Sequence, residues 1–195
     1  MNDWQSSDGE TPIDISGLKA KRVTNRRELS IAEAENVAEA VYKYLGGSLS
    51  GRVAPFTDTW SLRLHKEMFG RVWNWAGEPR RKDLNLGVPA YQISQELFSL
   101  FEDLAVWDTA WPDRIEQAAH LHYRAVRIHP FQNGNGRWSR MLANIWLRLK
   151  KHAIINWPGD IGETSPIRAE YLERLKAADA GDFDPFLELH RRYVK

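Results

Sequence analysis

The segment His129-Pro-Phe-Gln-Asn-Gly-Asn-Gly-Arg-Trp-Ser-Arg140 holds the residues of this sequence best suited to chemistry. Gly134 and Gly136 flank Asn135, and glycines allow neighbouring backbone amides to turn together toward an anion. One helical pattern ends at Ile128 and the next begins near Asn135 or Gly136, so the free amides of the second helix point into the same space. The spacing therefore predicts an anion-binding site.

Two arginines and a histidine indicate which anion would bind. Arg137 and Arg140 are three residues apart and share one face of the first helical turn, and two guanidinium groups suit a polyphosphate better than a single carboxylate. The unperturbed pKa of His129 lies near neutrality, so its imidazole can take a proton from an incoming hydroxyl. Phe131 is expected to anchor the turn in the core. Asn133 offers a carbonyl oxygen that would ligate Mg²⁺ between phosphates.

The elements that must position this segment are mainly helices. After Asn25, apolar residues recur at three- and four-residue steps and form one stripe on a helix that Gly46-Gly47 ends. A second helix is expected to begin at Thr57 as its cap, and a strongly apolar helix follows the motif as far as Lys150-Lys151-His152. Further helices are predicted at 94–107, 113–128, 166–178 and 184–193. The residues of the first stripe are Ile31, Ala34, Val37, Ala38, Val41 and Leu45.

The stretch from Arg80 to Ile93 does not have a helical pattern. Gly87 and Pro89 lie near its centre, and a short two-stranded hairpin is the expected form. The predicted fold is therefore all-α, a bundle of about seven helices with one small β-hairpin.

Composition limits the class of protein. At 195 residues, of which 43% are hydrophobic, the chain suits one domain, and we expect an N-terminal arm at 1–24 followed by the domain at 25–195. The net charge of +1 argues against a general nucleic-acid or membrane binder. The sequence has no cysteine and no apolar run long enough to span a membrane, so a cytoplasmic protein is expected. Its 9 tryptophans are interpreted as core and rim packing.

The segment 129–140 resembles the motif of the Fic family, His-Pro-Phe-x-Asp/Glu-Gly-Asn-Gly-Arg-x-x-Arg, with Asn133 at the acidic position. The stretch from Leu64 to Gly77, followed by Arg80, is similar to the family's approach to its flap. The stretch from Tyr171 to Asp182 is similar to its closing helices. The resemblance covers the chain from about residue 25 onward, and within the family it is closest to the subgroup called mobile mystery protein B.

This resemblance implies a Fic fold and a protein adenylyltransferase, which moves AMP from ATP to a Ser, Thr or Tyr hydroxyl of a target protein. His129 would be the general base, and Gly134, Asn135 and Gly136 would form the anion hole. Arg137 and Arg140 would hold the β- and γ-phosphates, with Asn133 as the residue toward Mg²⁺. The flap residues that would dock the target as an added strand are Gly87, Val88, Pro89, Ala90 and Tyr91.

Several alternatives remain open at this point. Because Asn133 is neutral, one alternative is a nucleotide-binding regulatory or toxin-antitoxin-type module with weakened catalysis. Another is an enzyme that transfers a different phosphate-containing group. A kinase-like relative that transfers the γ-phosphate is disfavoured by the intact Gly134-Asn-Gly-Arg137. DNA binding is disfavoured because the short basic runs, such as Arg80-Arg81-Lys82, come with no nucleic-acid motif.

The resemblance also raises the question of inhibition. Many members carry an inhibitory glutamate in a Ser/Thr-x-x-x-Glu-Gly/Asn motif that pairs with the second arginine, here Arg140. Glu10, Glu28 and Glu35 each match this motif in part. None is assigned that role, and an antitoxin-like inhibitor protein is an alternative.

Overall fold

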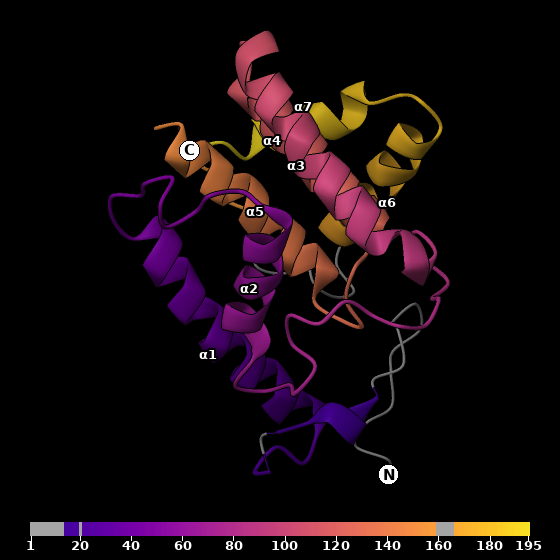
Figure 1. Cartoon of the computed structure of the whole chain (residues 1–195). Helices are drawn as coiled ribbons and strands as arrows, with labels where there is room; N and C mark the ends of the chain where they lie inside the picture. Colours follow the sequence, from indigo (N-terminus) through magenta and orange to yellow (C-terminus); the bar gives the residue numbers. More distant parts are fainter. Residues whose placement is uncertain (1–13, 20, 159–165) are drawn as a thin grey trace.

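The computed structural model describes residues 14–19, 21–158 and 166–195, and this part of the chain is built from helices (Figure 1). No helix in these ranges is long and apolar enough to cross a membrane. Two isolated backbone bridges, Leu18 to Trp73 and Ile155 to Val194, tie chain segments together within the same ranges. The elements in chain order are η1 (Ile15–Gly17), α1 (Arg26–Leu45), α2 (Asp58–Phe69), η2 (Ala90–Gln92), α3 (Ile93–Ala110), α4 (Arg114–Ile128), α5 (Asn135–Leu149), α6 (Pro166–Asp179) and α7 (Asp184–Arg192).

Local capping fixes where these helices begin. The Asn25 side chain accepts the amide of Glu28 at 3.0 Å, and Thr57 Oγ1 accepts the amide of Trp60 at 3.2 Å. Asp113 accepts two amides at the start of α4. Each cap satisfies an amide that has no partner inside its own helix. The all-α prediction and the expected helix starts are confirmed. Most of the predicted arm at 1–24 lies outside the described residues.

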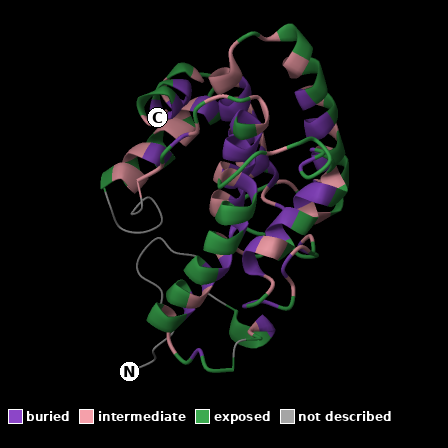
Figure 2. Ribbon diagram, turned by 90° about the vertical axis from the view of Figure 1, so that its left-hand side faces the viewer, coloured by how far each residue is buried: buried purple, intermediate pink, exposed green. Residues whose placement is uncertain are grey.

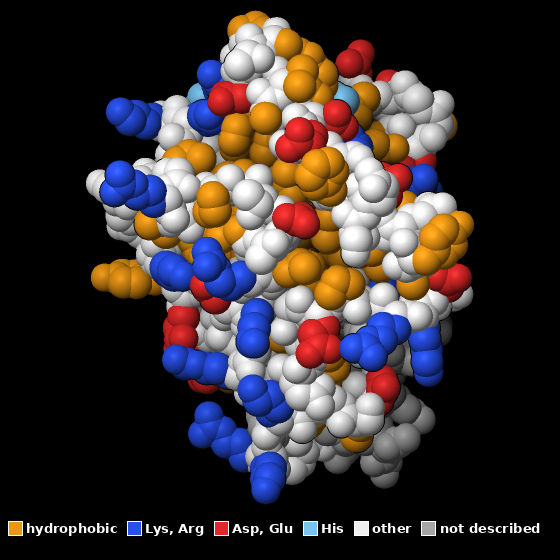
Figure 3. All heavy atoms as spheres, in the orientation of Figure 1, with side chains coloured by type: hydrophobic (Ala, Val, Ile, Leu, Met, Phe, Trp, Pro, Cys, Tyr) orange, Lys and Arg blue, Asp and Glu red, His pale blue; other side chains and the backbone are white. Residues whose placement is uncertain are grey.

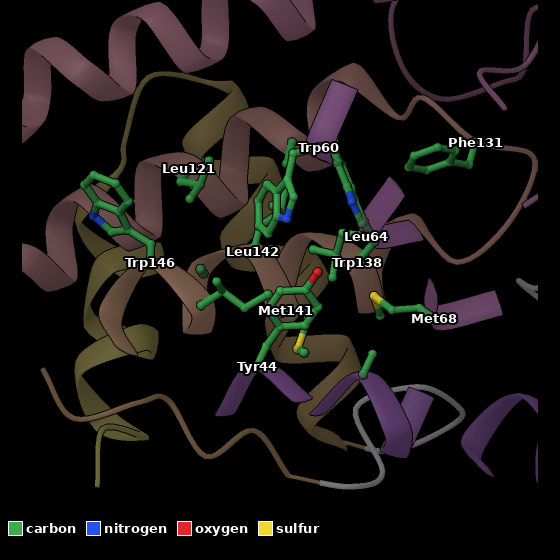
Figure 4. Packing of buried hydrophobic residues seen from close by; sticks show 14 of the residues in the cluster. Tyr44, Trp60, Leu64, Met68, Leu121, Phe131, Trp138, Met141, Leu142 and Trp146 are labelled. Carbon is green, nitrogen blue, oxygen red and sulfur yellow. The ribbon is translucent and has the colours of Figure 1, made fainter. Parts of the chain in front are cut away.

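The core surrounds α4 and α5, which pack against each other along the middle of the fold. Figure 4 shows Trp138 and Leu142 of α5 lying among Trp60 and Leu64 of α2. All four of these side chains are buried, and the indole of Trp138 donates to the Ser61 carbonyl at 2.9 Å. Burying a large apolar side chain stabilises the fold by roughly 2–3 kcal/mol. The interpretation of these tryptophans as packing residues is confirmed.

The apolar stripe of α1 is not the face that the helix buries. The buried positions of α1 are Leu29, Glu33, Asn36, Ala40 and Tyr44. An apolar stripe ordinarily faces the core, but Figure 2, which views the molecule from the α1 side, shows this helix with much of its surface exposed. The helix was predicted correctly, but its orientation was not. The buried face places Leu29, Ala40 and Tyr44 in the core and adds polar contacts of Glu33 and Asn36, whereas only Val37 and Leu45 of the stripe are partly buried. The exposed stripe positions are Ile31, Ala34, Ala38 and Val41.

The predicted hairpin between Arg80 and Ile93 is wrong. Across 80–89 the chain bends without regular secondary structure and leads into the single turn η2, and the described residues contain no strand. The buried guanidinium of Arg80 donates to the carbonyls of Lys82, at 2.9 Å, and of Val88. One side chain therefore holds both sides of the loop. It donates to backbone carbonyls that, in a β-hairpin, would accept hydrogen bonds from the amides of the opposite strand. Pro89, at the same place, has no N–H to offer a ladder.

Candidate active site

His129 ends α4 in an unusual backbone conformation. Its φ of 50° lies in the left-handed region, where a residue with a Cβ carries a strain of about 1–2 kcal/mol. Two hydrogen bonds from Arg80, which lies in the neighbouring loop, offset this strain. The Arg80 Nε donates to the His129 carbonyl at 2.8 Å, and the Arg80 amide donates to the Pro130 carbonyl at 2.8 Å. The direction of the His129 side chain is thus set by a residue far away in the sequence.

The imidazole of His129 is neutral at physiological pH. Its pKa is lowered to about 4, mainly by burial and also by the nearby charge of Arg80, while a hydrogen bond to the Val126 backbone acts in the opposite direction. A general base must have an unprotonated nitrogen when its substrate arrives. His129 therefore has the protonation state that proton abstraction requires.

Reciprocal hydrogen bonds hold the loop after His129. The Phe131 amide donates to Asn135 Oδ1 at 2.9 Å, and Asn135 Nδ2 donates back to the Phe131 carbonyl at 2.8 Å. The Phe131 ring is fully buried and meets the Trp138 ring edge-on, as the sequence predicted. The side chain of Asn135 is therefore used to shape the loop, which leaves its backbone amide, in the first turn of α5, as the group that it can offer to an anion.

His65, on α2, contacts the loop that follows His129, and its role was not predicted from the sequence. Its Nδ1 accepts the Gly77 amide at 3.0 Å, which leaves Nε2 as the nitrogen that donates to the Asn133 carbonyl at 3.0 Å. The ring also stacks on Phe131 with centroids 3.6 Å apart. Burial lowers the pKa of His65 to about 3, so the neutral ring with one fixed tautomer is the relevant form.

The start of α5 is open to an anion. Gly134 is the N-cap with a φ of 80°, and no side chain of the described residues caps the helix there. A Cβ at Gly134 would lie 2.7 Å from the Phe69 ring, so glycine is required for this close approach. The amides of the first turn, with the positive end of the helix dipole, point outward from this end. This arrangement suits phosphate oxygens.

The two motif arginines have different surroundings. The Nη1 of Arg137 lies 2.7 Å from Glu33 Oε2, and its guanidinium lies over the Phe69 ring, 4.7 Å from the centroid. Glu33 is buried, and its other oxygen accepts the Trp73 indole N–H at 2.6 Å. The Glu33 carboxylate of α1 therefore pairs with one edge of the Arg137 guanidinium, the first arginine of the motif. The sequence offered no signal for this pair, because the partial inhibitory motifs pointed to other glutamates and to Arg140.

Of the glutamates considered from sequence, the two that the structure describes, Glu28 and Glu35, make no ion pair with the motif arginines. Glu28 bonds to the amide and hydroxyl of Thr24, at 2.8 and 3.0 Å, and so caps its own helix. Glu35 is exposed. Glu10 lies outside the described residues.

Arg140 contacts a buried polar chain that links the site to the C-terminal helices. Burial lowers the pKa of Arg140, and a hydrogen bond with the Tyr171 hydroxyl acts against that effect. The Tyr171 hydroxyl lies 3.1 Å from His122 Nε2, and His122 Nδ1 lies 2.9 Å from His190 Nε2. His190 Nδ1 lies 2.8 Å from the Phe186 carbonyl and must donate to it.

This chain of contacts fixes every proton along it. Because His190 donates from Nδ1, its Nε2 accepts from His122, and His122 Nε2 in turn accepts from the Tyr171 hydroxyl. Burial lowers the pKa of both histidines, consistent with neutral rings. The Tyr171 oxygen is left as an acceptor that faces Arg140.

The flap passes directly over His129. A Cβ at Gly87 would lie 2.5 Å from His129 Cβ and 2.9 Å from the Ile128 carbonyl, and its φ of 91° also favours glycine. Beyond this point the Ala90 amide bonds to Asp83 Oδ1 at 2.7 Å, and the Tyr91 ring is 81% exposed. An open hollow of about 540 Å³ lies beside the flap, lined by Glu78, Pro79, Arg80, Arg81, Ala90 and Tyr91.

The described residues contain no group of three or more histidines, cysteines or acidic residues that would hold a metal ion by themselves. Asn133 Oδ1 accepts the Gly134 amide at 2.6 Å. A carbonyl oxygen has a second lone pair, so Asn133 fits as one ligand to a Mg²⁺ whose other ligands are phosphates and water.

Comparison with known proteins shows which family this chain is similar to. The model of the Fic/DOC family matches residues 55–147. Protein adenylyltransferase fic-1 of Caenorhabditis briggsae is 32% identical over 139 residues, which cover 68% of this chain and 25% of that protein. Protein adenylyltransferase Fic of Drosophila melanogaster is 32% identical over 152 residues, which cover 74% of this chain and 29% of that protein. The chain thus spans about a quarter of the length of these curated relatives.

Solved structures share the fold. A fragment of Fic-1 from C. elegans superposes with a TM-score of 0.65 at 24% identity, covering 89% of this chain and 50% of that one. BepC of Bartonella tribocorum, solved with bound AMPPNP, gives a TM-score of 0.67 at 18% identity, covering 92% and 93%. An N-terminal Fic domain from Bartonella quintana, solved with bound ADP, gives 0.65 at 20% identity, covering 90% and 88%.

Proposed function

The chain belongs to the Fic/DOC family, and we propose that it is a protein adenylyltransferase, which transfers AMP from ATP to a Ser, Thr or Tyr hydroxyl of a target protein. The observation that carries the proposal is the neutral His129 beside the open amides of α5 and two arginines. The names of the relatives, and the nucleotides bound in two proteins of the same fold, support it.

The proposed reaction is a displacement at the α-phosphorus of ATP. His129 takes the hydroxyl proton of the target, the target oxygen forms a bond to the α-phosphorus, and the bond from that phosphorus to the bridging oxygen of the β-phosphate breaks. Pyrophosphate leaves and AMP stays on the target as a phosphodiester. The amides of Asn135 and Gly136 would stabilise the charge that develops on the phosphate oxygens, and the Gly134 amide, which donates to Asn133 Oδ1 in this structure, would join them when that oxygen turns to the metal. Arg137 and Arg140 would hold the β- and γ-phosphates.

A magnesium ion bound with the nucleotide would neutralise phosphate charge, and Asn133 is the residue that would contact it. The fit rests on the position of Asn133 Oδ1 at the start of α5. The neutral amide contributes less attraction than a carboxylate would, so most of the affinity for the metal would come from the nucleotide.

The flap residues Gly87 to Tyr91 would dock the target protein. The exposed Tyr91 ring and the hollow beside it lie next to the loop that crosses His129. An extended target segment bound along this loop would bring its hydroxyl to the imidazole. We further propose that residues 25–195 form the catalytic domain and 1–24 an arm, and that the protein acts in the cytoplasm.

Labelled nucleotides test the proposal. Incubation with α-labelled ATP, Mg²⁺ and cell lysate should label proteins, whereas γ-labelled ATP should not. The His129→Ala variant should lose the label. His152→Ala should keep it, because the His152 ring lies outside the motif and bonds to the carbonyl of Ala153 at 3.0 Å. Labelling by the wild type no stronger than by His129→Ala would refute the proposal. Label from γ-labelled ATP instead would indicate a kinase-like reaction.

A second candidate function is a weakened nucleotide-binding module that acts with an antitoxin-like partner. Two observations favour it: Asn133 is neutral, and Glu33 already pairs with Arg137. This candidate predicts that the wild type binds ATP without transferring AMP. Transfer that appears in Asn133→Asp from an inert wild type would support this candidate over the first.

A further inference from the structure

Arg140 is the motif arginine that no carboxylate of the described residues neutralises. Arg137, the other motif arginine, is paired with Glu33. Arg140 instead has a hydrogen bond with the Tyr171 hydroxyl, which is a neutral group. Burial lowers the pKa of Arg140, and the nearby charges of Arg137 and Arg168 act in the same direction. A half-buried cation beside other cations is stabilised by an anion, and Tyr171 holds this guanidinium without supplying one.

The Tyr171 hydroxyl can accept from Arg140 only when its own proton points elsewhere, because an arginine side chain has donors and no acceptor. The acceptor of that proton is His122 Nε2, at 3.1 Å. His122 offers this lone pair because its Nδ1 donates to His190 Nε2, at 2.9 Å, and His190 in turn donates from Nδ1 to the Phe186 carbonyl. These hydrogen bonds form a relay whose direction is set by a backbone carbonyl of α7 and which ends at Arg140.

The relay joins four helices and is shielded from water. Arg140 lies on α5 and His122 on α4. Tyr171 lies on α6 and His190 on α7. Both histidines and the tyrosine are buried. The Trp157 ring meets both imidazoles edge-on, with centroids 5.5 Å from His122 and 4.9 Å from His190. Apolar surroundings strengthen these hydrogen bonds and keep water from competing for them.

Long-range attraction does not replace such placement. The net charge is only +1, and Figure 3 shows acidic side chains among the basic ones over the face viewed in Figure 1. A surface of mixed sign steers a triphosphate only weakly. The affinity for the terminal phosphates must then come from individual guanidinium groups that are held in the right orientation.

We propose that His122, supported by His190, is a positioning residue for nucleotide selection, which orients the Tyr171 hydroxyl so that Arg140 is held toward the β- and γ-phosphates. The inference rests on the proposed function, in which Arg140 binds those phosphates. AMP has no β- or γ-phosphate for this arginine to hold. The relay, which extends to a helix outside the motif, therefore sets the preference for ATP over AMP.

Titration calorimetry with ATP and with AMP, each with Mg²⁺, tests this role. His122→Leu removes both hydrogen bonds and should raise the dissociation constant for ATP about threefold to tenfold, while the constant for AMP changes less than about twofold. His122→Gln should restore most of the affinity, because its amide oxygen can accept from Tyr171 and its amide nitrogen can donate to His190. Leu189→Ala is the matched control. Leu189 is a fully buried neighbour of His190 on α7 and is no member of the relay, so this variant should lose stability and keep the preference for ATP.

A double-mutant comparison separates positioning from stability. In an Arg140→Ala background, His122→Leu should change the affinity for ATP no further, because the guanidinium that the relay orients is absent. Its effect on the midpoint of urea unfolding should remain in both backgrounds. Equal losses of affinity for ATP and AMP in His122→Leu would overturn the inference, and so would an equal loss of preference in Leu189→Ala. A wild type that prefers ATP but transfers no AMP would refute the proposed function and support the positioning role. A wild type that binds no ATP would overturn both.

Discussion

Replacement of Glu33 by glutamine should strengthen nucleotide binding. Glu33 is buried on α1 and bonds to two groups, the guanidinium of Arg137 at 2.7 Å and the indole of Trp73 at 2.6 Å. Glutamine has nearly the same shape, and its amide oxygen can still accept the indole N–H. The substitution therefore removes a negative charge beside Arg137 while it leaves the contact between α1 and Trp73 in place.

The size of the effect follows from the charge that is removed. A phosphate oxygen held by Arg137 would lie about 6 Å from the Glu33 carboxylate, because both share one guanidinium. At an effective dielectric constant of about 20–40, the repulsion is roughly 1.4–2.8 kcal/mol. The lower value applies because the Arg137 side chain is 35% exposed and screened by water. We therefore expect the dissociation constant for ATP to fall about tenfold in Glu33→Gln.

Titration calorimetry with ATP at low ionic strength measures this change. Glu39→Gln is the matched control, because Glu39 lies on the same helix and pairs with Arg71, outside the site. Its affinity for ATP should equal that of the wild type. The gain in Glu33→Gln should shrink as salt is added, because screening weakens the repulsion. An affinity that is unchanged or weaker in Glu33→Gln would refute the reasoning and would mean that Glu33 serves to orient Arg137. If no variant binds ATP, the proposed function fails instead.

Three further predictions concern the supports of the site. Tyr171→Phe should weaken ATP binding about threefold to tenfold and destabilise the fold by about 1–2 kcal/mol, since both Arg140 and His122 lose a partner. Calorimetry measures the first effect and urea unfolding the second, and Tyr123→Phe is the control for both. His65→Ala should lower the free energy of unfolding by about 2–4 kcal/mol, because two hydrogen bonds and a stacked ring are lost. If this free energy falls no more than it does in Arg63→Ala, a substitution at an exposed residue, the prediction is contradicted. Stability should also fall on acidification from pH 6.5 toward 4. The folded-state pKa values of His65 and His190 are depressed to about 3 and 4, so the unfolded chain binds more protons in this window. Each should cost about 2 kcal/mol by pH 5, and unfolding curves that do not change between pH 7 and 5 would show this to be wrong.

The sequence by itself determined the features that depend on neighbouring residues. Asn25, Thr57 and Asp113 cap helices at the predicted places, because a cap needs only its own side chain and an amide two or three residues away. The loop from His129 to Gly134 was predictable for the same reason, since its glycines and the start of α5 are local. The all-α fold and the family followed from these patterns.

Only the tertiary structure decided which side chains surround that loop. The expected hairpin is absent from the described residues because Arg80 is buried and takes the carbonyls on both sides of the flap. Most of the apolar stripe of α1 faces outward because the other face packs Leu29, Ala40 and Tyr44 in the core and bonds Glu33 to Trp73 and Arg137. These contacts join residues far apart in the chain. A periodic pattern shows that a helix has two faces, but the partners that other helices offer decide which face is buried. On α1 the buried face combines apolar Leu29, Ala40 and Tyr44 with polar Glu33 and Asn36.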